Sequence, residues 1–215
     1  MRLRNGEHGY GLITKTLHWL TVVLVAGQFA VGLTMEADDR AVERADDRID
    51  ALEDAGEDAA QRHGDAAEDT FDDQIDRLRD ELDAHDDDIT SAFADVVSGS
   101  FWREGLSLPE IHVLLGVSLL VLGVVRVAWR RATPLPPWAP YLSAREEMLE
   151  SVVEKLVLVS LFVVPLSGLL LVVDDGLLGV HIAAQLAFVL VIAVHVGLVL
   201  RHTVVRRNGQ LRRML

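Results

Sequence analysis

Four long apolar stretches constrain the fold of this 215-residue chain more than any other feature of its sequence. They cover residues 17–35, 111–129, 152–173 and 177–200. At about 1.5 Å of rise per residue, each is long enough as a helix to cross a hydrocarbon core of about 30 Å. Runs such as LAFVLVIAVHVGLVL have no polar face, which argues against buried helices of a soluble protein. The sequence therefore predicts an all-α integral membrane four-helix bundle.

The first apolar stretch could also be read as a cleaved signal peptide. It is longer than the apolar region of such a peptide, and the following GLTMEADD has no A-x-A cleavage site. We therefore expect a first transmembrane helix.

Basic residues gather in three segments outside the apolar stretches. They lie before residue 17, at Arg130, Arg131 and Arg145, and between residues 201 and 213. The positive-inside rule assigns all three segments to the cytoplasm. We expect a multi-pass protein of the cell (plasma) membrane with both termini in the cytoplasm.

The negative charge of the chain is confined to one insert between the first two apolar stretches. Residues 36–100 contain 24 of the 33 acidic residues but only six basic ones, so their net charge is −18, while the whole chain carries −13. Such a field repels phosphate and excludes nucleic acid as a partner of the insert. The absence of cysteine excludes disulfides, thiolate metal sites and iron–sulfur clusters.

Apolar residues within the insert recur at helical spacing. They form two seams with steps of three and four residues: Val42, Ala45, Ile49 and Leu52, then Phe71, Ile75, Leu78, Leu82, His85 and Ile89. This spacing predicts two paired helices, and thus an extracytoplasmic helical hairpin turning near His63, Gly64 and Asp65. The Asp-rich, Lys-free composition is typical of a halophilic surface; disorder and a cation-binding or docking module are the alternatives. Asp86, Asp87 and Asp88 lack the spacing of an EF-hand loop.

Three regions follow from these patterns. Residues 1–35 comprise the N-terminus and first transmembrane helix, residues 36–107 the acidic insert, and residues 108–215 the other three helices, the cytoplasmic loop and the basic tail.

Four histidines lie within the apolar stretches, where a titratable side chain suggests a function. His18 and His195 lie near the cytoplasmic ends of their helices, whereas His112 and His181 begin theirs from the outer side. His181 and His195 are 14 residues apart, so they project from one helix face with a rise of about 21 Å. A lone intramembrane histidine is more often a packing residue, but two pairs at two depths predict two metal centres.

The ligand types favour haem b at both centres. Without cysteine, and without a carboxylate at either depth, each pair supplies two axial imidazoles, whereas zinc needs more ligands than either level offers. We therefore expect His18, His195, His112 and His181 to bind the iron of two b haems. Arg126 and His202 lie where the propionates of the cytoplasmic-side haem should emerge, and His202 could also contact a quinone.

Four motifs in order resemble the bacterial cytochrome b-561 family. They are YGLITKTLHWL, IHVLLGVSLLVLGVVRVAWR, PLSGLLL and HIAAQLAFVLVIAVHVGLVLRHTVVRRNGQLRRML. The resemblance covers about 150 residues, all but the acidic insert. It implies a four-helix membrane cytochrome with two b haems, one bound by His18 and His195 and the other by His112 and His181.

The resemblance also implies electron transfer between an outer donor and the quinone pool, and a close relative oxidises superoxide with ubiquinone as acceptor. The acidic insert is unusual for the family and opposes the approach of an anion such as superoxide at low salt. Glu154 stands where the family often has a histidine, and it either delivers protons or forms a structural ion pair.

Two other functions also agree with the sequence. The chain could be the cytochrome subunit of a hydrogenase- or dehydrogenase-type partner, with the insert as docking surface. It could instead be a haem-free membrane protein whose acidic hairpin is a sensor or cation-binding module.

Overall fold

The computed structural model describes residues 3–6, 9–63, 71–72, 74–79 and 89–207. The chain divides into two compact units. The first comprises Met1–Gln28 and Val113–Leu215, and the second comprises Phe29–His112. Each unit is described separately below.

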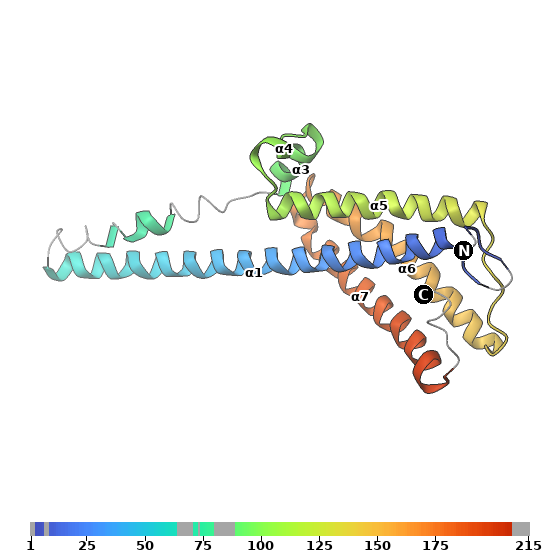
Figure 1. Ribbon diagram of the computed structural model, residues 1–215. Helices are drawn as coiled ribbons and strands as arrows, with labels where there is room; N and C mark the ends of the chain where they lie inside the picture. Colours follow the sequence, from blue (N-terminus) through green and yellow to red (C-terminus); the bar gives the residue numbers. More distant parts are fainter. Residues whose placement is uncertain (1–2, 7–8, 64–70, 73, 80–88, 208–215) are drawn as a thin grey trace. The chain divides into compact units, whose positions relative to one another are not determined.

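Within the described part of the chain, four helices are long and apolar enough to cross a membrane. They are α1 (Leu12–His63), α5 (Leu108–Ala132), α6 (Ala144–Leu171) and α7 (Leu178–Leu200), as labelled in Figure 1. Each contains one of the four apolar stretches of the sequence. The prediction of an all-α protein with four membrane helices is therefore confirmed.

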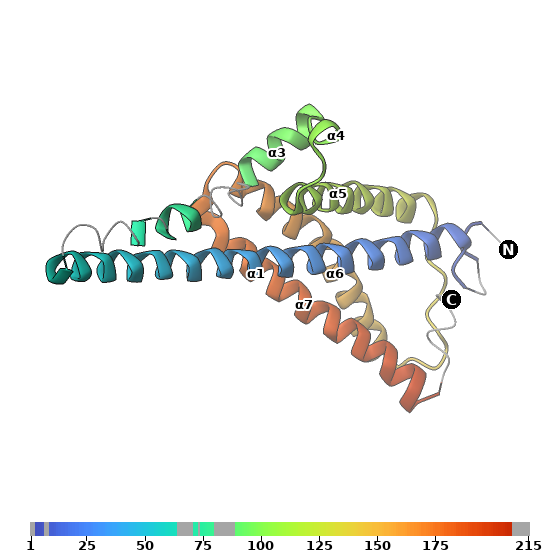
Figure 2. The ribbon, with the colours of Figure 1, turned by 60° about the vertical axis from the view of Figure 1, so that its left-hand side comes forward.

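Helix α1 continues well beyond the apolar stretch that predicted it. Its 52 residues run from the membrane segment into the acidic insert without interruption (Figure 2). The sequence explains this continuity, because no Gly or Pro occurs between Gly32 and Gly56 to stop the helix. The 28 residues after position 35 add about 42 Å of helix.

In the first unit, α6 and α7 pack against each other and are joined by a short turn. The turn contains the 3₁₀ segment η1 (Asp175–Leu177), and the Asp174 carboxylate accepts the N–H of Gly176 at 3.0 Å. Helices α5 and α6 approach closely where a Cβ at Gly123 would lie 3.1 Å from the ring of Phe162. The core of this unit includes Leu119, Leu122, Leu161 and Phe188.

Large apolar side chains also cover the outside of these helices. Val121, Val159, Leu186 and Leu190 are all more than half exposed. An exposed apolar surface of this extent is stable in lipid but not in water, in agreement with a bilayer around the bundle.

Asn5 fixes the start of α1 within the first unit. Its side-chain oxygen accepts the N–H of Gly11 at 2.9 Å and the hydroxyl of Thr14 at 2.8 Å. Its amide donates to the carbonyl of Pro134 at 3.2 Å, and Trp129 of α5 donates to Thr14 at 3.0 Å. These bonds set the rotation of α1 against α5 one turn before His18.

In the second unit, the acidic part of α1 has helical residues 71–72 and 74–79 beside it (Figure 1). Ile49 and Ile75 are buried, and Glu53 forms an ion pair with Arg79. Of the predicted turn, Gly64 and Asp65 lie outside the described residues, as do Leu82, His85 and Asp86–Asp88. Ile89, the last residue of the second seam, is the first described residue of α3 (Ile89–Ser98), which is followed by α4 (Phe101–Glu104). The hairpin as a whole stays a prediction.

Candidate functional site

His18 and His195 face each other in the first unit. His18 lies on α1 and His195 on α7, and their ring centroids are 6.5 Å apart with an interplanar angle of 59°. Both side chains are partly buried. The two imidazoles that sequence depth places at the same level therefore come together in space.

The separation of these rings suits one metal ion between them. Two metal–imidazole bonds of about 2 Å each put the nitrogens about 4 Å apart, and each centroid lies roughly 1 Å further out, which gives about 6 Å in all. The observed 6.5 Å is close to this value. The residues therefore fit bis-imidazole binding of the haem iron that the sequence predicts at this level.

His181 is buried and held by hydrogen bonds from two helices. The hydroxyl of Ser167 on α6 lies 2.9 Å from Nδ1 and donates to the carbonyl of Val164 at 2.8 Å. Since Ser167 has only one hydroxyl proton, its oxygen accepts from Nδ1–H, so Nε2 is the ring nitrogen with the lone pair. The Gln185 amide nitrogen lies 2.6 Å from that Nε2. This tautomer is the one that a metal-binding histidine needs, with the ring N–H opposite the metal fixed by an acceptor.

Both outer histidines lie against glycine backbone. A Cβ at Gly168 would come within 3.1 Å of the His181 ring. In the second unit, a Cβ at Gly32 would come within 3.4 Å of the His112 ring. His112 and His181 belong to different units, so each is described on its own.

Arg126 of α5 reaches α1 one helical turn from His18. Its guanidinium donates to the hydroxyl of Thr21 at 2.8 Å and to the carbonyl of Leu17 at 3.3 Å. The Thr21 hydroxyl in turn donates to Leu17 at 2.7 Å. A half-buried positive charge is thus fixed beside His18, where an acidic group of a ligand would neutralise it.

Three glutamates on one face of α6 bind basic residues from neighbouring elements. They are spaced four residues apart, at Glu146, Glu150 and Glu154, and so lie in line along the helix. Glu154 pairs with Arg130 at 3.0 Å, and Glu146 pairs with Arg206 at 2.8 Å and Arg201 at 3.4 Å. The ion pair of Glu154 matches the structural alternative raised from the sequence.

The middle glutamate pairs with a histidine that is fully enclosed. His202 has no exposed surface, and its Nε2 lies 3.4 Å from Glu150 Oε1. The ring of Tyr141 lies 6.3 Å from the His202 ring, centroid to centroid. His202 belongs to the π-helical segment η2 (Arg201–Val205), a wide turn that often marks functional sites. This arrangement can hold a proton next to the C-terminal end of α7.

Sequence reasoning did not single out Ser167, Gln185 or Gly32 as functional residues. A signal for the first two exists, because Ser167 is a polar residue in the apolar α6 and Gln185 follows His181 by one helical turn. Gly32 has no such signal, because its contact with His112 depends on how two helices pack.

A family model described as prokaryotic cytochrome b561 matches residues 9–215. The match includes the acidic insert and all four membrane helices. Searches of curated proteins and of solved structures gave no match.

Proposed function

The chain belongs to the prokaryotic cytochrome b561 family of membrane haem b electron-transfer proteins, and we propose that it moves electrons across the cell membrane between an outer one-electron donor and the quinone pool. In this proposal it holds two b haems, one at His18 and His195 and one at His112 and His181. In this proposal both termini and the arginine-rich loop between α5 and α6 lie in the cytoplasm. The observation that carries the proposal is the 6.5 Å pairing of the His18 and His195 rings from two different helices.

Bound haem b supplies a one-electron redox couple, and the residues of the chain supply its position and surroundings. His18 and His195 would hold the iron through their imidazole nitrogens. The Arg126 guanidinium, fixed to Thr21, would offer its remaining N–H groups to a propionate. Ser167 would hold His181 with Nε2 toward its metal.

The cytoplasmic end of the bundle offers a place for proton exchange with a quinone. Quinone reduction consumes protons, and a buried histidine beside a carboxylate can accept and release them. His202 and Glu150 form such a pair, 3.4 Å apart. Glu154 is engaged with Arg130, which favours a structural role for it.

Steady-state turnover of the purified protein tests the proposed donor and acceptor. With superoxide or a small one-electron reductant as donor and a soluble ubiquinone as acceptor, we expect quinol formation that is lost in His18→Ala and His195→Ala. Protein that carries haem but stays inert until a partner subunit is added would favour the docking alternative. Purified protein without haem would favour the sensor or cation-binding alternative.

The rate of electron transfer from superoxide should depend strongly on ionic strength. The charge of −18 on residues 36–100 repels a small anion at low ionic strength. Salt shortens the Debye length to about 10 Å at 0.1 M and about 3 Å at 1 M, which removes most of this repulsion. We therefore expect superoxide-driven turnover to rise with salt if superoxide is the physiological donor.

A further inference from the structure

The segment between the acidic part of the insert and α5 differs sharply from the rest of the insert. Residues 36–88 contain 23 acidic and six basic side chains, whereas residues 89–107 contain only Asp95, Arg103 and Glu104 as charged residues. This nearly neutral segment forms α3 and α4. Its composition is that of an apolar surface element rather than of a hydrated acidic arm.

Helix α3 has one apolar and one polar side. At 100° per residue, Ile89, Phe93, Val96 and Val97 fall within about 100° of arc, and Ser91, Asp95 and Ser98 lie opposite. In a water-soluble domain the apolar side of such a helix would face the interior.

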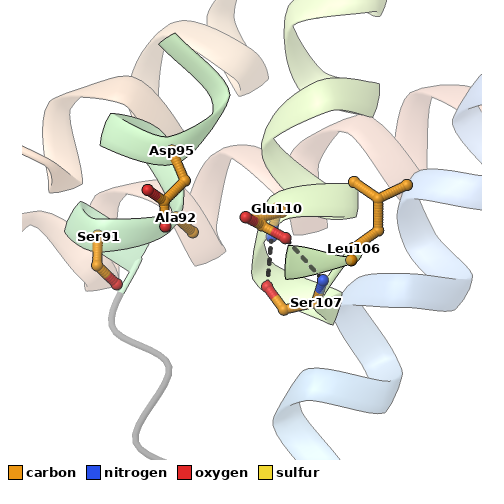
Figure 3. A pocket seen from close by; sticks show the side chains of 7 residues that line it. Ser91, Ala92, Asp95, Leu106, Ser107 and Glu110 are labelled. Atoms are coloured by element: carbon orange, nitrogen blue, oxygen red, sulfur yellow. Dashed lines mark hydrogen bonds between the residues drawn. The ribbon is translucent and has the colours of Figure 1, made fainter. Parts of the chain in front are cut away.

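In the structure this apolar side is only partly covered, since Ile89, Phe93 and Val96 are half-buried whereas Val97 is exposed. Ser91, Ala92 and Asp95 of α3 face a hollow of about 360 Å³ whose other wall is the chain from Gly105 to Glu110 (Figure 3). On this second wall, the buried Glu110 carboxylate accepts the N–H of Ser107 at 2.7 Å. Val97, on the apolar side, is 71% exposed, and Trp102 of α4 is 81% exposed. Ala92 is the buried residue of α3, and Val97 and Trp102 are the large apolar side chains of this segment that stay exposed.

A tight corner fixes this exposed apolar surface. The Asp95 carbonyl accepts N–H groups from Gly99 at 2.8 Å and Ser100 at 3.1 Å, and the Ser100 hydroxyl donates to the Asp95 carboxylate. Gly99 adopts a φ of +76°, which favours glycine. Val97 and Trp102 are therefore presented by a defined turn and not by a loose loop.

The covalent chain places this surface close to the bilayer. Only Gly105, Leu106 and Ser107 separate the end of α4 from the start of α5, a span of at most about 14 Å. The apolar stretch of α5 begins at Ile111, so α4 cannot leave the headgroup region of the leaflet that α5 enters. Leu106, in the connection, is itself 52% exposed.

We propose that α3 and α4 form an interfacial anchor that rests on the phospholipid bilayer at the surface where α5 enters. Val97, Trp102 and Leu106 contact the boundary between headgroups and acyl chains. Tryptophan favours this boundary because its ring is apolar while its N–H can bond to headgroups, and the adjacent Arg103 can reach lipid phosphate. The anchor ties the end of the acidic insert to the membrane surface.

Site-directed spin labelling of the full-length protein tests this anchor, because the chain has no cysteine of its own. Single variants Val97→Cys and Trp102→Cys would be labelled and reconstituted in vesicles of phosphatidylcholine with one fifth phosphatidylglycerol. Collision with oxygen, which concentrates in lipid, is compared with collision with a water-soluble nickel chelate. The matched controls are Ser98→Cys, on the polar side of α3, and Asp58→Cys, on the exposed acidic part of α1.

We expect a several-fold higher ratio of oxygen to nickel accessibility at positions 97 and 102 than at positions 98 and 58. Equal nickel accessibility at all four positions would overturn the proposal, because the segment would then lie in water. Protection of positions 97 and 102 from both reagents would also overturn it in favour of a protein partner or a second copy. If Trp102→Cys fails to fold, Val97→Cys and Leu106→Cys give the same comparison.

Discussion

At the scale of single residues, one hydroxyl decides which nitrogen of His181 is available to a metal. Ser167 donates its proton to Val164 and accepts from Nδ1–H, which leaves the lone pair on Nε2. Ser167→Ala removes this acceptor and leaves a buried N–H without it. We expect about 10- to 100-fold weaker retention of the haem bound by His181, the usual cost of losing such an outer partner.

The midpoint potential of the same haem should rise in Ser167→Ala, because an imidazole whose N–H loses its acceptor donates less electron density to ferric iron. Redox titration of the purified variant measures this shift. Ser160→Ala is the matched control, since it lies on the same face of α6 about 10 Å away. A haem content and potential unchanged in Ser167→Ala would show that the serine only packs against the ring.

The sequence predicted the level of each histidine more readily than its surroundings. The distance of each histidine from the end of its apolar stretch was enough to predict that His18 and His195 lie at the same level of the membrane. The contacts of Ser167 and Gln185 with His181 depend on helix rotation instead. Hydropathy does not set that rotation in the membrane-spanning parts of α6 and α7, which have no polar face.

At the scale of helices, one face of α6 binds both α5 and the end of α7. This face carries Glu146, Glu150 and Glu154. Each glutamate pairs with at least one basic side chain. In this way ion pairs connect the ends of three helices at the surface that the sequence predicts to be cytoplasmic. The apolar pattern predicted these helices but not their ion pairs, because the partner of each charged side chain depends on how the helices pack.

Glu150→Ala tests the enclosed pair in this row. It leaves the fully buried His202 ring without the carboxylate 3.4 Å from its Nε2. We expect a loss of about 1–3 kcal/mol, the usual cost of a buried polar group that loses its partner. That loss corresponds to a fall in Tm of about 2–4 °C per kcal/mol for a chain of this size, measured by thermal unfolding in detergent.

Arg145→Ala is the control for this measurement, because it removes an exposed charged side chain from the other side of the same helix. We expect its Tm to stay close to that of the native protein, within about 0.5 kcal/mol of stability. Equal effects of the two substitutions would contradict a specific contribution of the Glu150–His202 pair.

Helix α1 shows where a hydropathy pattern falls short at this scale. The apolar stretch ends at residue 35, yet the helix continues to His63. Hydropathy locates the part of a helix that lies in lipid, whereas the end of the helix depends on stop signals, and no Gly or Pro occurs between Gly32 and Gly56. The membrane helix and the first arm of the insert are consequently one element.

At the scale of the whole molecule, charge is separated between an acidic insert and a basic remainder. Residues 36–100 carry −18, and the other 150 residues carry +5. The net charge of −13 therefore reflects the insert and not the membrane helices. Its main effect is on which electron donors can approach from the side of the insert.

Reduction kinetics at varied ionic strength test this separation. Reduction of the haem by ascorbate, an anion, should accelerate with added salt, whereas reduction by hexaammineruthenium(II), a cation, should slow. The control is a triple variant that combines Asp46→Asn, Asp47→Asn and Asp50→Asn. In this variant the reduction rates with both donors should depend less steeply on salt. Equal slopes for the two donors would mean that the insert does not influence the electron entry site.

The haem content per chain tests the central claim most directly. Pyridine haemochrome analysis of the purified native protein should give two b haems per chain, and His195→Ala should give about one. His63→Ala, which removes a histidine from α1 outside its apolar stretch, should still give two. Fewer than two haems in the native protein, or two in His195→Ala, would contradict the assignment of the paired histidines as haem ligands.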